Sequence, residues 1–560
     1  MVRKFFAFFE RDIGSLHQAA YVLAFSSFAS QILALFRDRL LAHNFGAGPE
    51  LDVYYAAFRV QDFIFVSVAS FLSFAVLIPF LVERVEEGKD SLRRFTTNVF
   101  SFSSLALLVA SSCAFLFAPQ LSSWLFPGIR GEYHSHLISM MRILLLSPFL
   151  LSLSNLLGAV SQSLRKYYLF ALSPVLYNLG IIIGIYAFYL PTKNLSMLAW
   201  GVILGAFLHL LVQLPFALRE GFFPLFSFRS KFLELKEIVS LSFLRAVSLA
   251  SGQIVLLVLL GIASVLGAGA ISILSLSNNL QSILLSLIGA SYSVAAFPVL
   301  ARFFGSGEKD HFIREFSAAA RHIIFWALPG SIFFIVLRAQ IVRVAYGTGA
   351  FSWDDTRLTA AALSLFMISI TAQCLSLLCL RSYYATKNSK RPLIITIISS
   401  LATIAACYGG LFLFRSSPFF ANLLEALFRV SGIPGTEVLM LPLAFSLGAI
   451  LNALLFFLFF KKDFGVSQFE IGATAYHAFA GGVFGGFIAY QTLTFFGEVL
   501  DLNTFLGVFL QGTLAGISGI FASSLLLFAL KNKEFFEMTK AFKSRFKKEI
   551  LIPPQESLLE

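Results

Sequence analysis

The chain has 560 residues, of which 58% are hydrophobic and only 13% are charged, and its mean hydropathy is +0.82. Soluble domains carry about 25% charged residues, so this composition excludes a water-soluble globule and predicts a membrane protein. The net charge of +12 is typical of a membrane protein with basic cytoplasmic loops, and we expect no nucleic-acid binding.

Apolar runs long enough to cross a bilayer recur along the chain, since a spanning helix needs about 20 mostly apolar residues. We therefore predict an all-α polytopic membrane protein with about fourteen transmembrane helices. No small-residue cleavage site follows the first run, so we expect it to be a retained helix. The second and eighth runs are long and contain polar residues, which predicts a tilt or a break. The predicted spans are 18–36, 53–82, 95–118, 137–160, 168–190, 197–218, 240–266, 270–300, 318–337, 358–380, 392–414, 437–460, 472–497 and 503–530.

The basic residues predict the orientation of these helices. If the N-terminus is cytoplasmic, 29 of the 42 Lys and Arg residues fall in the cytoplasmic segments. Cytoplasmic loops are enriched in Lys and Arg, so this distribution places both termini in the cytoplasm.

An internal repeat is visible at an offset of about 220 residues. The segment 45–48 (FGAG) recurs at 266–269 (LGAG), and the segment 79–81 (PFL) recurs at 298–300 (PVL). An even number of helices separates the two copies, which predicts two parallel six-helix lobes related by pseudo-two-fold symmetry around a central cavity. The predicted domains are lobes at 1–220 and 221–465, two additional helices within 466–530, and a basic cytoplasmic tail at 531–560.

Several short motifs resemble the MurJ/MviN family of lipid II flippases, within the MOP exporter superfamily. The motifs are FRDR at 36–39, FGAG at 45–48, AAFR at 56–59, ALSPVLYN at 171–178, GAF at 349–351 and DDT at 354–356. The resemblance implies that the protein moves an undecaprenyl-pyrophosphate-linked peptidoglycan precursor from the inner to the outer leaflet of the bacterial cytoplasmic membrane, by alternating access. Membrane lipids and this lipid-linked pyrophosphate are the implied partners, and other cell-wall synthesis proteins are candidate partners.

The chain departs from the family pattern where the family carries cavity cations. Gln31 follows Ser30 in place of an arginine, Phe65 and Val66 replace an arginine pair, and Asn278 and Asn279 replace an Asp-Arg pair. The acidic residue of the seventh helix is also missing, because no Asp or Glu occurs between Glu237 and Glu308. By resemblance, the positions of Gln31 and Asn279 face the cavity, so both residues are candidates for binding the substrate.

Arginines near the predicted helices are the candidates for binding the substrate. A dianionic headgroup needs a cationic path through about 30 Å of hydrocarbon, and the guanidinium fork matches phosphate oxygens. The candidates are Arg37, Arg59, Arg142 and Arg245. Arg142 and Arg245 lie near helix ends, so snorkelling to the membrane surface is the alternative for both.

Three acidic residues lie in or near the first two predicted helices. Asp38, Asp52 and Asp62 are candidates for ion coupling, and the alternative is that they balance the charges of Arg37, Arg39 and Arg59. We favour charge balance, with Asp62 as the candidate for coupling. Glycines in the last two predicted helices, at 481, 482, 485, 486, 512, 516 and 519, predict close helix packing. By resemblance these helices also border a groove for the lipid tail.

Neither a nucleophile–base pair, a phosphate-binding loop nor a metal-ligand cluster is visible in the sequence. We therefore expect a transporter and not an enzyme, with no cofactor and no metal. Two alternatives remain open: a same-fold exporter of another polyprenyl-linked glycan or small molecule, and a non-transporting scaffold for cell-wall enzymes.

Overall fold

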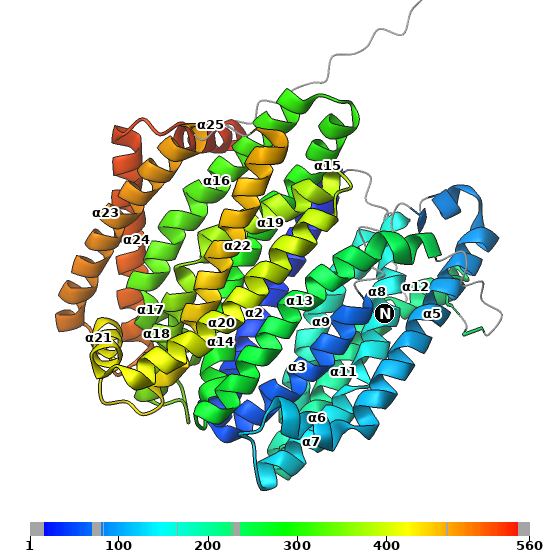
Figure 1. Cartoon of the computed structure of the whole chain (residues 1–560), viewed down its shortest axis with the longest axis horizontal. Helices are drawn as coiled ribbons and strands as arrows, with labels where there is room; N and C mark the ends of the chain where they lie inside the picture. The colour runs from blue at the N-terminus through cyan, green and yellow to red at the C-terminus, as the bar shows by residue number, and fades with distance from the viewer. Residues whose placement is uncertain are drawn as a thin grey trace, which may run out of the picture. The chain divides into compact units, whose positions relative to one another are not determined.

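The computed structural model of the chain describes residues 16–69, 80–81, 83–164, 166–224, 226–227, 236–465 and 469–546. Every regular element in these residues is a helix (Figure 1). The all-α prediction is therefore confirmed for the described part of the chain. Long apolar helices are expected in lipid because a helix satisfies its backbone hydrogen bonds within one segment.

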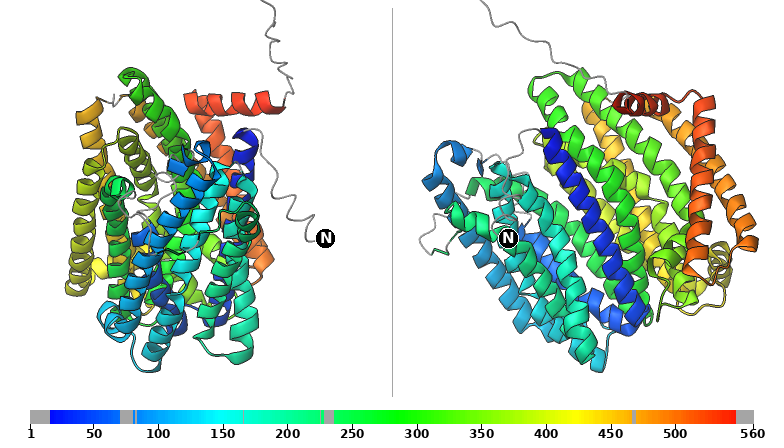
Figure 2. Two further views of the ribbon diagram at one scale, coloured as in Figure 1. Left: turned by 90° about the vertical axis from the view of Figure 1, so that its right-hand side faces the viewer. Right: turned by 180° about the vertical axis from the view of Figure 1, so that it is seen from behind.

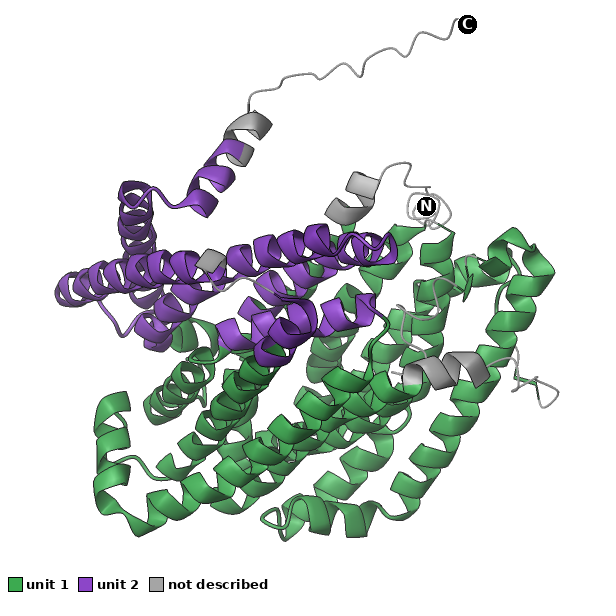
Figure 3. Cartoon of the chain, turned by 45° about the horizontal axis from the view of Figure 1, so that its top comes forward, with its two compact units in different colours: residues 1–283, 341–369, 387–456 green, residues 284–340, 370–386, 457–560 purple. Residues whose placement is uncertain are grey.

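The described chain forms two compact units, coloured separately in Figure 3. The first unit contains the described residues up to 283 together with 341–369 and 387–456. The second contains 284–340, 370–386 and the described residues from 457 onwards. The division into lobes at 1–220 and 221–465 stays a prediction.

The first unit contains most of the helices. They are α2 (Leu16–Phe45), α3 (Pro49–Ala69), α5 (Lys89–Leu116), α6 (Ala118–Leu125), α7 (Glu132–Leu144), α8 (Ser147–Ser163), α9 (Tyr167–Gly184), the π-helix η2 (Ile185–Tyr189), α10 (Leu190–Thr192), α11 (Met197–Leu211), α12 (Leu214–Arg219), α13 (Lys236–Leu266), α18 (Trp353–Met367), α20 (Lys390–Ser416), α21 (Pro418–Phe428) and the 3-10 helix η5 (Thr436–Leu439). Most of α14 (Ala270–Leu284), α17 (Arg338–Tyr346) and α22 (Met440–Phe464) also belongs to this unit.

The second unit contains fewer and longer helices. They are the π-helix η4 (Leu285–Ala290), α15 (Ser291–Gly305), α16 (Lys309–Val336), α19 (Ile370–Ala385), α23 (Phe469–Val499), α24 (Phe505–Ala529) and α25 (Lys533–Phe546). The short helix α25 contacts α16 and α24, and it lies across the end of α24 (Figure 2).

Ten helices of the described residues are long and apolar enough to cross a membrane, and the broken pair α18 and α19 raises this number to eleven at most. The predicted total of about fourteen therefore stays a prediction in its exact number. The predicted span 270–300 is one helix, Ala270–Gly305, with a π-helical segment inside it. The predicted span 358–380 is not continuous: α18 ends at Met367 and α19 begins at Ile370. Part of the predicted span 53–82 lies outside the described residues.

Close packing of the last two predicted helices is confirmed, and the glycines show how it is achieved. A Cβ atom on Gly485 of α23 would lie 2.5 Å from the carbonyl oxygen of Gly519 on α24. Gly482 and Gly486 face a different neighbour, because a Cβ on either would touch Ile332 of α16. The glycines of α23 therefore let two helices approach its backbone at once.

Candidate functional site

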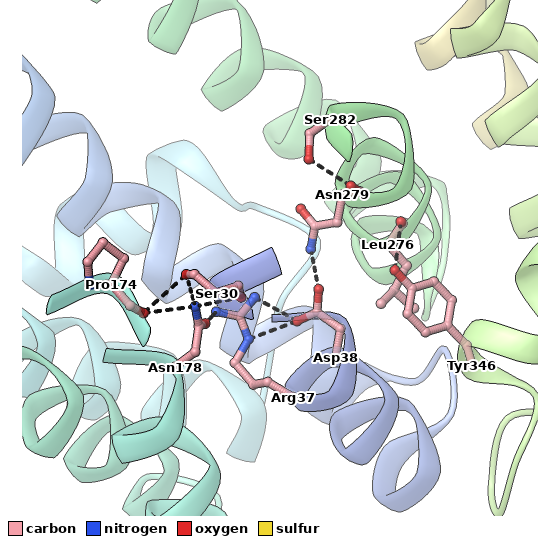
Figure 4. A network of polar contacts seen from close by, with 9 residues as sticks. All are labelled: Ser30, Arg37, Asp38, Pro174, Asn178, Leu276, Asn279, Ser282 and Tyr346. Atoms are coloured by element: carbon pink, nitrogen blue, oxygen red, sulfur yellow. Dashed lines mark hydrogen bonds and ion pairs between the residues drawn. The ribbon is translucent and has the colours of Figure 1, made fainter. Parts of the chain in front are cut away.

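Arg37 lies at the centre of a polar network that joins three helices of the first unit (Figure 4). Its Nε and one terminal nitrogen donate to Oδ1 of Asp38 at 2.9 and 2.7 Å, and its other terminal nitrogen donates to Oδ1 of Asn178 at 3.0 Å. The second carboxylate oxygen of Asp38 accepts from Nδ2 of Asn279 at 2.8 Å. One charge pair on α2 is thus held between carboxamides of α9 and α14.

The local structure of α9 explains how Asn178 is positioned. Its amide nitrogen lies 3.1 Å from the Ser30 hydroxyl and 3.3 Å from the carbonyl of Pro174, and that hydroxyl also donates to the Pro174 carbonyl. These contacts fix the amide so that its oxygen faces Arg37. Asn178 belongs to the sequence motif at 171–178, yet the motif alone indicated no role for it.

The ion pair is largely shielded from solvent. The side chain of Arg37 is 15% exposed and that of Asp38 is 4% exposed. Neighbouring residues in a helix do not face each other, so the guanidinium must fold back to reach Asp38. Asp38 thus lies where it can balance the charge of Arg37, and its role stays a prediction.

Tyrosines that the sequence did not identify as candidates surround the ion pair. Tyr54 and Tyr55 of α3 and Tyr177 of α9 lie close enough to Arg37 for electrostatic interaction. The hydroxyls of Tyr54 and Tyr55 are buried and have no hydrogen-bond partner among the described residues. Buried polar groups are normally paired, so these hydroxyls are available to a polar ligand. The available signal was the Tyr-Tyr pair directly before the motif at 56–59.

Arg59 bridges α3 and α13. One of its terminal nitrogens donates to Oε1 of Gln253 at 3.3 Å, and its buried Nε has no partner within the described chain. Asp62 lies one helical turn further along α3 and interacts electrostatically with Arg59 and Arg37. The structure thus brings Arg59 and Asp62 into the neighbourhood of Arg37.

Arg142 and Arg245 are not brought into this network. Nε of Arg142 lies 3.4 Å from the carbonyl of Phe115, and its guanidinium sits 5.0 Å above the ring of that residue. Nε of Arg245 donates to the Ser389 hydroxyl at 3.3 Å, beside the start of α20. These contacts near helix ends favour the snorkelling interpretation.

Gln31 is partly buried on α2 and is not one of the residues that bind Arg37.

Asp52 does not balance an arginine, which corrects the sequence-based interpretation. Its carboxylate accepts from the backbone nitrogens of Gly269 and Ser272 at 2.6 and 2.7 Å and from the Ser272 hydroxyl at 2.6 Å. It therefore caps the N-terminus of α14, where unpaired N–H groups and the helix dipole favour an anion. Arg39 donates to the carbonyls of Val344 and Ala345 at the end of α17.

The repeated glycine turns have a structural role. Gly46 and Gly269 have positive φ angles of 62° and 88°, and a Cβ atom on Gly269 would collide with the carbonyl of Ala47. The turn at 46–48 therefore packs against its repeat at 267–269. A third motif joins them, since the Ala350 nitrogen donates to the His43 carbonyl at 2.9 Å.

No group of three His, Cys, Asp or Glu side chains in the described residues could hold a metal ion. The chemistry available around Arg37 is instead that of anion binding, with one charge pair, two carboxamides and two unpaired tyrosine hydroxyls.

Residues 41–509 match the protein family described as Lipid II flippase MurJ. A Rickettsia prowazekii protein described as a probable lipid II flippase MurJ is 27% identical over 392 residues, which cover 69% of this chain and 76% of that protein. A Burkholderia cenocepacia protein described as lipid II flippase MurJ is 24% identical over 461 residues, covering 80% of this chain and 84% of that protein.

Solved structures agree with this fold. The structure of a lipid II flippase MurJ in an inward closed conformation has a TM-score of 0.70 at 21% identity, and covers 91% of this chain and 100% of that chain. The inward-facing structure of a multidrug resistance MATE family transporter of the MOP superfamily has a TM-score of 0.61 at 15% identity, over 78% of this chain and 94% of that chain.

Proposed function

Because the chain belongs to the lipid II flippase MurJ family, we propose that it moves lipid II from the inner to the outer leaflet of the cytoplasmic membrane by alternating access. The observation that carries this proposal is the Arg37 network, which places an arginine among unpaired hydroxyl groups in a chain of membrane-spanning helices. Transport of this lipid requires no bond to be made or broken, so we expect no enzymatic activity.

The guanidinium of Arg37 has capacity left for a phosphate. Three of its N–H groups are used by Asp38 and Asn178, and a guanidinium has five. Two N–H groups therefore remain for pyrophosphate oxygens, and the Tyr54 and Tyr55 hydroxyls can add further hydrogen bonds.

Asp38 is the exchangeable counter-ion in this proposal. An uncompensated arginine inside a membrane costs at least about 2.5 kcal/mol, so the transporter without bound substrate needs an anion beside Arg37. When the pyrophosphate arrives, it takes over part of this neutralising role, and Asn279 keeps its hydrogen bond to Asp38. After release of the headgroup, Asp38 pairs with Arg37 again.

Asp62 is our candidate for coupling transport to protons. It lies near Arg59, Arg37 and Tyr177, and no salt bridge within 4.0 Å joins it to a basic side chain in the described chain. A carboxyl group in this position can take up a proton when the anionic pyrophosphate binds to these arginines and release the proton when the pyrophosphate leaves.

We extend the proposal to the arrangement of the chain. Two lobes at 1–220 and 221–465 would surround the cavity, and the contact between the turns at 46–48 and 267–269 supports their symmetry. The helices within 466–530 would guide the lipid tail, and both termini, including the tail at 531–560, would face the cytoplasm.

The experiment is complementation of bacteria depleted of their own lipid II flippase, combined with translocation of lipid II in vesicles that contain the purified protein. We expect growth and translocation with the natural chain.

Asn279 stands where the resemblance implies an arginine. This replacement favours one rival function, the export of a polyprenyl-linked glycan with a less charged headgroup. Translocation of a polyprenyl monophosphate sugar but not of lipid II would support that rival.

A further inference from the structure

The last described helix is basic and amphipathic. Helix α25 (Lys533–Phe546) follows the membrane-spanning helix α24 after a short turn and lies across its end (Figure 2). The sequence repeats an apolar residue at 535, 538, 542 and 546, a spacing that forms one stripe along a helix. The sequence from 531 to 548 also contains seven Lys or Arg and two Glu. Such a segment, placed directly after a membrane-spanning helix, is typical of helices that lie in the membrane surface.

The acidic side chains of α25 attach its first turn to the second unit. The buried carboxylate of Glu534 lies 3.2 Å from Nε of Arg321 on α16, and it accepts from the Thr474 hydroxyl of α23 at 3.0 Å. Nε2 of His322 on α16 lies 3.4 Å from a carboxylate oxygen of Glu537. These contacts fix α25 at the ends of two membrane-spanning helices and direct both of its carboxylates towards the protein.

The lysines of α25 point away from the protein. Lys540 is exposed, and none of the ion pairs among the described residues includes it. Lys533 is 71% exposed, and its ammonium lies 3.9 Å from Glu537. An exposed pair at this distance has little energy, so Lys533 remains able to bind another anion. The exposed surface of α25 is therefore cationic.

Phe536 connects this cationic surface to the lipid-facing side of α24. It is 41% exposed, and its ring centre lies 5.6 Å from that of Phe528, which is 58% exposed at the end of α24. Because α24 is long and apolar enough to cross a bilayer, an exposed phenylalanine on it contacts lipid. Lys533 and Lys540 lie three and four residues from Phe536, so all three share one face of the helix.

We propose that this face of α25, formed by Lys533, Phe536 and Lys540, binds the headgroups of anionic phospholipids at the membrane surface. The inference commits to phospholipid because the cationic face is continuous, through Phe536 and Phe528, with a surface that contacts lipid. A basic residue near an anionic membrane surface strengthens binding by about fivefold. The proposal goes beyond the proposed function, since it concerns the phospholipids around the transporter. It also leaves the helices within 466–530 to the lipid tail of the substrate.

Tryptophan quenching measures which phospholipid lies beside α25. The reporter is Phe536→Trp in the full-length chain, with its four native tryptophans replaced by phenylalanine. The protein is placed in equal mixtures of phosphatidylglycerol and phosphatidylcholine, and one of the two lipids carries bromine on its acyl chains. We expect relative binding at this position to favour phosphatidylglycerol at least about fivefold, and the preference should fall at high salt through screening. Equal quenching by the two lipids would overturn the proposal. Weak quenching by both would show that protein covers this face, and would overturn it as well.

Charge variants test whether the lysines produce this preference. In the reporter chain, Lys533→Gln with Lys540→Gln should lower the preference for phosphatidylglycerol at least about threefold. The matched control is Lys461→Gln with Lys462→Gln, which removes two exposed charges from the last turn of α22 and should leave the preference unchanged. An undiminished preference in the first variant, or an equal loss in the control, would refute binding by α25.

Discussion

The replacement of Arg37 by alanine is expected to have two effects that can be separated. The first is on folding, because Asp38 would stay buried with only the Asn279 hydrogen bond. Removing one partner of a buried ion pair costs about 3–5 kcal/mol, and we expect the lower end because the Arg37 side chain is 15% exposed. The second effect is on transport, since each charge-assisted hydrogen bond to phosphate is worth roughly 1.5–3 kcal/mol, or about ten- to a hundredfold in rate or affinity.

A double variant distinguishes these effects. Arg37→Ala with Asp38→Asn removes both charges, so the free energy of unfolding should return towards that of the natural chain, while lipid II translocation stays at least about tenfold slower. Arg37→Lys should rescue only part of the transport, because it keeps the charge and loses the guanidinium fork. Thermal unfolding in detergent measures the first effect, and complementation with vesicle translocation measures the second. Transport at the natural rate by the double variant would show that Arg37 only neutralises Asp38, and would refute headgroup binding at this site.

Three further predictions concern orientation, packing and capping. Single cysteines are placed in a cysteine-free background and labelled in intact cells with a membrane-impermeant thiol reagent. Cysteines at two predicted cytoplasmic positions should resist the reagent, and cysteines at two predicted outer positions should react. The reverse labelling pattern would show that the predicted orientation is wrong. The cytoplasmic replacements are Gly88→Cys and Asn388→Cys, and the outer ones are Arg130→Cys and Ser431→Cys. Gly485→Ala should lower the free energy of unfolding by about 1–3 kcal/mol through overpacking. Gly472→Ala should not lower it, because a Cβ atom at residue 472 meets no atom within 4 Å. Equal effects of the two variants would contradict the packing argument. Asp52→Ala should destabilise the protein by about 0.5–2 kcal/mol through loss of the α14 cap, and Asp52→Asn should destabilise it by less. Transport per folded molecule should be unchanged in both variants. A specific transport defect in Asp52→Asn would make Asp52 a candidate for ion coupling again.

Parts of the candidate site could be predicted from the sequence alone. Arg37 and Asp38 are adjacent in the chain, so their pairing is local and is a natural expectation from the sequence. Asn178 and the two tyrosines could not be assigned, because a polar residue in an apolar helix shows its role only through its neighbours on other helices. The structure places Arg59 beside Gln253 of α13, a contact that no motif or charge pattern indicated.

The class of protein and most of its helices follow from the order of residues in the chain. Apolar runs of about 20 residues must be helical in lipid whatever surrounds them, and glycines spaced four apart already indicate close helix packing. Which charged group meets which partner depends instead on the tertiary fold. Arg37 reaches Asn178 across 141 positions, Asp52 reaches Ser272 across 220, and Arg39 reaches Val344 across 305. Local periodicity carries no information over such separations, and the partners of Asp52 and Arg39 include backbone groups, which no sequence pattern marks.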